Sequence, residues 1–171
     1  MERGASEPFW QIDAEYNTAF DSIKPNILPF KDDSKLPLEK TYRLRGYSAS
    51  EEGNTIVNES YWRVLSDTTF YPVYDEVNVH EIDFSEYLII DEEHKSIMGL
   101  VLNSENEPYY QGGKITIPAG IVKIGNSSFR NNHTIKKVFC KDTSLKTIEN
   151  NAFEDSSLEY FEFKNDSITE I

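Results

Sequence analysis

The sequence predicts a mainly β protein with one short helix, an α+β module followed by the start of a repeat solenoid. Two patterns in its 171 residues predict this fold class. Apolar residues alternate with charged ones in the first half, as in half-buried strands, and recur about every 23 residues in the last third, as in stacked repeats. We expect a first module over residues 1–76, a connector and capping hairpin over 77–111, and repeats over 112–171.

The helix is expected over residues 13–23, near the start of the chain. Four apolar residues recur at the three- and four-residue spacings of one helical face: Ile12, Tyr16, Phe20 and Ile23. Asp13 is a suitable N-cap, and Pro25 would end the helix because proline cannot continue it.

Three strands are expected after the helix, over residues 41–49, 61–65 and 68–74. The first alternates apolar and charged side chains in the run YRLR, which predicts one buried and one exposed face. Gly46 indicates a bulge or bend in this strand. Pro72 indicates that the last strand lies at a sheet edge or carries a bulge, because proline donates no ladder hydrogen bond.

This order of elements resembles the internalin-type B-repeat, a small β-grasp-like module. The matching residues are Leu36-Pro37, the YRLRGY of 42–47, Trp62, Val64 and the DTTFYPVY of 67–74. Gly46-Tyr47 stands where the family has a Gly-Trp step, and EPFWQI, residues 7–12, would be its opening strand. The resemblance covers roughly residues 7–76. It implies a spacer or weak protein-binding unit of modular surface proteins.

The region between the two halves is expected to hold an acidic connector and a hairpin. Residues 75–86 carry five acidic side chains and no lysine or arginine, so we expect a tether with few apolar contacts across it. The apolar runs 87–90 and 97–102 flank the polar turn DEEHKS, which predicts a β-hairpin. A repeat stack needs its first open end covered, and we expect this hairpin to be the cap.

The last third of the chain repeats one apolar pattern. Equivalent residues of three units lie 23 apart in two columns: Ile115, Val138 and Phe161, then Ile117, Cys140 and Phe163. Two further pairs lie 24 apart, because one loop is a residue longer: Ile124 with Ile148, and Phe129 with Phe153. One such unit cannot bury its apolar edge alone, so the units are expected to stack on one another.

These units resemble the BspA-type leucine-rich repeat, whose units carry an Ile-Pro step, an Ile-Gly pair and an Ala-Phe pair. The match lies in ITIPAGIVKIGNSSF and LKTIENNAF, and the resemblance covers about residues 112–171. Ser128 replaces the usual alanine, Glu149 replaces the glycine, and only the first unit has its proline, Pro118. The resemblance implies surface proteins of bacteria and microbial eukaryotes, and phage proteins, that bind macromolecules. It implies no catalytic residues.

The third unit stops at Ile171, which matches Ile148 of the unit before it. Its Ala-Phe pair is missing, so the strand LEYFEF would present an apolar end to water that includes Phe161, Phe163 and Ile168. Such an end favours association. We expect it to be covered, either by further repeats of a longer polypeptide or by another chain.

Charge and composition exclude several classes of partner. The net charge of −13 argues against nucleic acid or an anionic membrane, because both need a basic face. Solubility explains this charge most simply; a cationic partner or bound calcium is the alternative. No apolar run approaches the roughly 20 residues of a membrane span. The opening MERGASEPFW lacks the apolar core of a signal peptide.

No catalytic or metal-binding pattern is found in the sequence. His80, His94 and His133 are far apart in polar contexts, so we expect exposed or incidental histidines and not a metal site. The acidic runs 31–33 and 91–93 lack the spacing of a calcium loop and are expected to be solvated. The sequence therefore predicts no cofactor and no enzyme activity.

Cys140 is the single cysteine, so no internal disulfide can form. It occupies the strand position equivalent to Ile117 and Phe163, which predicts a small buried core residue and not a catalytic thiol. Gly112-Gly113 precedes a strand and does not open a helix, so it is not a phosphate-binding loop.

Aromatic side chains are the candidate interaction surface. Exposed aromatic residues can anchor protein or glycan ligands, although the same residues can also fill or shield a core. Those that we propose for the surface are Trp62, Tyr71, Tyr109, Tyr110, Phe161 and Phe163.

Both resemblances point to a non-catalytic interaction module displayed at a surface. Its setting would be a phage virion appendage or fibre, which needs no signal peptide, or a bacterial surface adhesin. We favour the virion slightly, because Met1 suits a native start and the single cysteine suits assembly in the cytoplasm. The partners would be proteins of a virion or surface assembly, or further repeats of the same polypeptide, and an oligomer is possible. The alternative is an accessory binding region of a larger modular enzyme whose catalytic domain lies outside these residues.

Overall fold

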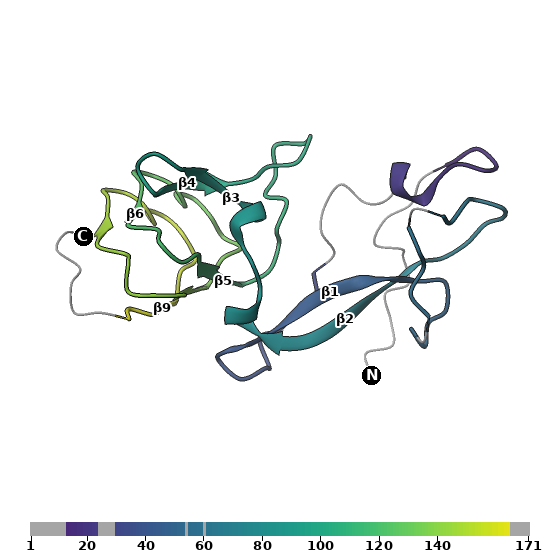
Figure 1. The fold of residues 1–171 in the computed structure, drawn as a ribbon, viewed down its shortest axis with the longest axis horizontal. Coiled ribbons are helices and arrows are strands. Elements are labelled where there is room, and N and C mark those ends of the chain that lie inside the picture. Colours follow the sequence, from purple (N-terminus) through teal and green to yellow (C-terminus); the bar gives the residue numbers. More distant parts are fainter. Residues whose placement is uncertain (1–12, 24–29, 54, 60, 165–171) are drawn as a thin grey trace.

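The computed structural model describes residues 13–23, 30–53, 55–59 and 61–164 (Figure 1). The described chain is mainly β, with helix only in three short 3-10 turns, so the mainly β fold class is confirmed. The opening strand expected over residues 7–12 lies outside the described residues, as do Pro25 and Ile168.

The first half is built around a two-stranded antiparallel ribbon. β1, Lys40–Ser48, pairs with β2, Tyr71–Asn78. The register shifts between Leu44 and Gly46, so the first expected strand and its bulge are both confirmed. Gly46 has a φ of +146°, and a Cβ there would lie only 2.8 Å from the Ile56 side chain, so the bulge requires glycine.

The helix expected over residues 13–23 is wrong. Only η1, Phe20–Ser22, is helical, and it is a single 3-10 turn. The backbone before it pairs with a distant segment instead: Asn17 N donates to Val64 O at 2.6 Å, and Val64 N donates to Thr18 O at 2.9 Å. Asn17 also has a φ of +70°, which no α-helix accommodates. Tertiary pairing has overridden the helical spacing of the apolar residues.

The strand expected over residues 61–65 is also wrong. The described backbone there makes one isolated bridge, between Ala19 and Arg63. β2 starts within the run 68–74, where the last strand was expected, and continues past its end. Pro72 lies in β2, which pairs with β1 and with no other described strand. This position agrees with the sheet edge that the proline indicated.

Aromatic rings form the core of the first half. Phe20, from η1, is fully buried at their centre. Its ring centroid lies 4.5 Å from that of Phe70, 5.4 Å from that of Tyr47 and 6.1 Å from that of Trp62. Tilted and edge-to-face contacts at these distances hold η1 against Tyr47 of β1 and against the segment that precedes β2.

The last third forms a parallel sheet from three successive units. Its strands, in spatial order, are β5, Lys114–Ile117, then β7, Lys137–Cys140, and β9, Tyr160–Phe161. Ile115 lies opposite Val138, and Val138 lies opposite Phe161. The 23-residue spacing in the sequence is therefore the register of this sheet.

A second sheet runs alongside it and contains the expected hairpin. Its strands, in spatial order, are β3, Leu88–Asp91, then β4, Ser96–Leu100, β6, Lys123–Ile124, and β8, Thr147–Ile148. β3 and β4 are antiparallel, which confirms the hairpin, and β4, β6 and β8 are parallel. Ile124 lies opposite Ile148, as their 24-residue spacing predicts.

The turns between the strands repeat as faithfully as the strands. Ser127 and Asn151, 24 residues apart, both have left-handed backbone, with φ of +57° and +58°. The rings of Phe129 and Phe153 stack 5.1 Å apart and almost parallel. Phe129 N donates to Ala152 O at 2.8 Å, so the turns are also joined through the backbone. Equivalent residues of successive units thus occupy equivalent positions.

The acidic connector contributes to the repeat core, and it is more than a tether. Beyond β2 it forms two 3-10 turns, η2, Val79–Glu81, and η3, Ser85–Tyr87. Val79 and Phe84 are almost fully buried in the apolar cluster that also contains the repeat strands. In Figure 1 the ribbon leads outward from the repeat units. The division of the chain after residues 76 and 111 stays a prediction.

Candidate functional site

The six aromatic residues proposed for the surface fall into separate groups. Trp62 is half-buried and packs edge-on against Phe70, with ring centroids 4.6 Å apart. Tyr71 is half-buried at the start of β2, opposite Ser48. Neither belongs to the apolar cluster of the repeat units, so the structure does not join these two residues to the others.

Tyr109 and Tyr110 differ sharply despite being neighbours. Tyr109 is half-buried, and its ring lies on that of Tyr87 with centroids 6.2 Å apart. Tyr110 is only 8% exposed, and its hydroxyl donates to Lys114 O at 2.8 Å. Burial, and secondarily the nearby Asp33 carboxylate, raises the pKa of Tyr110. The expectation that Tyr110 is a surface residue is corrected: it is part of the core.

Phe161 and Phe163 lie together at the last described strand. Their rings stack with centroids 4.5 Å apart, and Phe153 meets Phe161 edge-on at 5.9 Å. Phe161 is half-buried, whereas Phe163 is 48% exposed. We call Phe153, Phe161 and Phe163 the aromatic end. It continues the apolar columns of the repeat, whose earlier members, such as Val138, are buried by the unit that follows them.

A charged group borders the aromatic end. The Glu162 carboxylate accepts a hydrogen bond from Cys140 N at 3.2 Å and lies 3.9 Å from both His80 Nε2 and Lys164 Nζ. The His80 side chain is 23% exposed and its ring packs edge-on against Phe139. His80 is therefore partly buried, whereas solvent exposure was one of the expectations for it. His94 and His133 are exposed, as expected.

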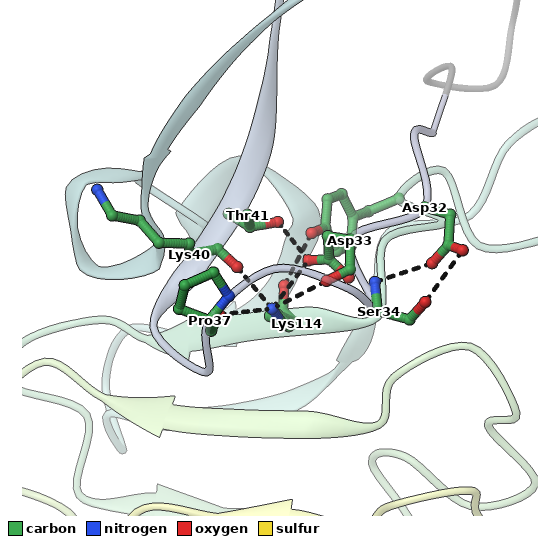
Figure 2. Close-up of polar contacts among 8 residues, drawn as sticks. Asp32, Asp33, Ser34, Pro37, Lys40, Thr41 and Lys114 are labelled. Carbon is green, nitrogen blue, oxygen red and sulfur yellow. Dashed lines mark hydrogen bonds and ion pairs between the residues drawn. The ribbon is translucent and has the colours of Figure 1, made fainter. Parts of the chain in front are cut away.

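A buried polar cluster lies where the ribbon meets the first repeat strand (Figure 2). The Lys114 side chain is 2% exposed, and its ammonium nitrogen lies 3.6 Å from the Asp33 carboxylate. Thr41 Oγ1 donates to the same carboxylate at 2.6 Å. Burial lowers the pKa of Lys114, and the Asp33 charge opposes that effect. The expectation that residues 31–33 form a solvated acidic run is wrong for Asp33, which is buried.

The sequence carries only a weak signal for this cluster. Lys114 begins a strand whose other residues are Ile115 to Ile117, and Asp33 follows Asp32, which is exposed. The two residues are far apart in the chain, and their pairing depends on how the ribbon docks. The one available hint was a lysine at the first position of an otherwise buried strand, where a charge needs a partner.

Cys140 is a free, buried thiol, as the repeat position predicted. It is 3% exposed. Burial, and secondarily the Glu162 charge, raises its pKa to about 12. Because the thiolate is the reactive form, this environment makes the sulfur inert.

We expect Cys140 to react with a thiol reagent at pH 8 at least about a hundred-fold more slowly in the folded protein than in urea. The unfolded thiol ionises near pH 9, but the folded thiol stays protonated until about pH 12. The unfolded state thus loses its proton first, and stability should fall as the pH rises through this window. Urea titrations between pH 8 and 11 measure this slope, which Cys140→Val should reduce. Rapid, complete labelling of folded protein would contradict the strand register.

Two features are absent from the described part of the chain. Within residues 13–164, apart from the undescribed gaps, no cluster of three or more His, Cys, Asp or Glu side chains is suited to holding a metal ion. The same described part contains no helix of the length and apolar character that a membrane crossing requires.

Comparison with known proteins identifies one similarity. A family described as a BspA-type leucine-rich-repeat region of six copies matches residues 110–171. The match coincides with the parallel units of the structure and confirms the resemblance for this part of the chain. No curated protein and no solved structure matches the chain. Domains of leucine-rich repeats generally bind proteins through the extended surfaces that stacking creates.

Proposed function

We propose that this chain is a non-catalytic protein-binding module, in which a β-grasp-like B-repeat unit precedes the start of a BspA-type solenoid. The module would be displayed at a surface, on a phage virion appendage or fibre or on a bacterial cell. The match of residues 110–171 to a repeat family supports the binding role. The resemblance of the first half to surface-protein spacers supports the setting.

The aromatic end carries the proposal. Strand β9 has β7 on one side and no described strand on the other. Phe163, two residues after β9, is half exposed and stacks on Phe161. The equivalent residues of the preceding unit, Val138 and Cys140, are buried. Aromatic side chains at a strand edge favour contact with another polypeptide. The occupant would be a protein strand with the same alternating apolar pattern, from an assembly partner or a further repeat.

Self-association of the purified chain tests this role. Sedimentation velocity over a range of concentrations should detect reversible association, and Phe163→Glu should weaken it by about ten-fold or more, because a charge would enter an apolar contact. Leu65→Glu is the matched control: Leu65 is 62% exposed in the first half, and the change adds the same charge. It should leave association unchanged. A monomer at all concentrations, or equal effects of the two variants, would count against the aromatic end.

A further inference from the structure

β5 lies at one edge of the three-stranded sheet, and β9 lies at the other. β5 is the first strand of this sheet, so its outer edge has no strand partner among the residues that the structure describes. An open first edge exposes backbone groups and invites association. All four residues of β5 are nevertheless buried, including the polar Lys114 and Thr116. Something other than a repeat unit therefore covers β5.

The expected capping hairpin covers a different edge. β4 pairs in parallel with β6, and Ile97 lies opposite Ile124. The hairpin therefore begins the four-stranded sheet and leaves the first edge of the three-stranded sheet to another segment.

The base of the ribbon, residues 33–40 together with η2, packs against the side chains of β5. Thr116 Oγ1 donates to Val79 O, at the start of η2, at 3.1 Å. Val79 N donates in turn to Glu39 O at 2.8 Å, so η2 and the segment before β1 are joined. The Lys114 ammonium group donates to three backbone carbonyls at or just before the start of β1: Asp33 at 3.3 Å, Pro37 at 3.3 Å and Lys40 at 2.5 Å. Figure 2 shows these acceptors converging on Lys114.

We infer that residues 33–40, together with η2, form the second half of the N-terminal cap of the repeat stack, and that Lys114 locks them in place. The hairpin closes one sheet and the ribbon base closes the other. This inference depends on the stacked units and not on the binding role of the aromatic end, so either can fail without the other.

The next unit shows that docking, and not residue type, distinguishes Lys114. Lys137 lies directly opposite Lys114 in the parallel register. It is half-buried, whereas the Lys114 side chain is almost wholly enclosed. A buried ammonium group is tolerated only with a full set of partners, and the carbonyls and Asp33 supply them. The same residue type at the same repeat position thus has two environments, and the ribbon base makes the difference.

Hydrogen exchange of the full chain tests the inference, with Lys114→Met as the variant. Loss of the lock should uncover β5 first. We expect amides of β5 and of residues 33–40 to exchange at least about ten-fold faster, and amides of β9 to change by less than about two-fold. Lys137→Met is the matched control, and it should leave the exchange of β5 unchanged.

A milder variant keeps the test decisive if Lys114→Met does not fold. Thr41→Val removes the hydroxyl that holds the Asp33 carboxylate, without changing side-chain volume much. It should speed amide exchange most in β5, less in β7 and least in β9. Retained protection of β5 in the folded variants would overturn the cap, as would an equal loss of protection in all three strands.

Discussion

Replacing Cys140 with aspartate should lower the free energy of unfolding by about 3–5 kcal/mol, because it places an unpaired charge in the repeat core. The position is 3% exposed, and the Glu162 carboxylate already lies close enough to accept a hydrogen bond from the backbone of Cys140. The new carboxylate would therefore meet a like charge as well as an apolar environment. Urea unfolding followed by circular dichroism at pH 7 measures the loss.

Cys140→Ala separates the effect of charge from that of lost volume. Alanine removes the sulfur without adding a polar group, so we expect a loss of only about 1–2 kcal/mol. The cost of the aspartate should also shrink at pH 4, where its carboxyl group can take up a proton and become neutral. Equal stabilities of the two variants at pH 7 would mean that the side chain at position 140 points into water.

The repeat units were predictable because the spacing of equivalent residues in the sequence gives the register of their strands. Residues that pair in a parallel sheet of identical units recur at the length of one unit, so Ile115, Val138 and Phe161 could be aligned without coordinates. The one-residue change of period also predicted which loop is longer. Local sequence patterns are enough to predict a structure in which each unit contacts only its neighbours.

The first half was less predictable because its structure depends on contacts between distant segments. The spacing of Phe20 and Ile23 suits a helix, but the backbone at Thr18 pairs with Val64, and Phe20 fills an aromatic core. Aromatic residues satisfy helical and extended patterns equally well. The choice between them was made by partners that no short window of sequence contains.

The burial of Tyr110 and Asp33 at the junction has no local signal in the sequence either. The sequence around Tyr110 suggests a surface aromatic residue, and that around Asp33 suggests a solvated acidic run. Both are buried where the ribbon base meets Lys114. A docked interface between residues such as Asp33 and Lys114, which lie 81 positions apart, has no period and no motif, so composition alone suggests a tether there.

Gly112→Ala should be among the most damaging substitutions in the chain, with an expected loss of about 2–4 kcal/mol in the free energy of unfolding. A Cβ at Gly112 would lie 2.1 Å from the hydroxyl oxygen of Tyr110 and 2.3 Å from Cζ of its ring. The ring cannot easily move aside, because it is buried and its hydroxyl is bonded to Lys114 O. Urea unfolding measures the loss.

The adjacent glycine provides the control for this prediction. A Cβ at Gly113 would meet its nearest atom, Asp33 Oδ1, at 3.8 Å, which is ordinary contact. Gly113→Ala should therefore change stability by no more than about 1 kcal/mol, and could raise it by restricting the unfolded chain. In a Tyr110→Leu background the alanine at position 112 has more room, so its cost should fall, as expected for residues in direct contact. A cost that does not depend on residue 110 would show that Gly112 is needed for its backbone and not for the space that it leaves to Tyr110.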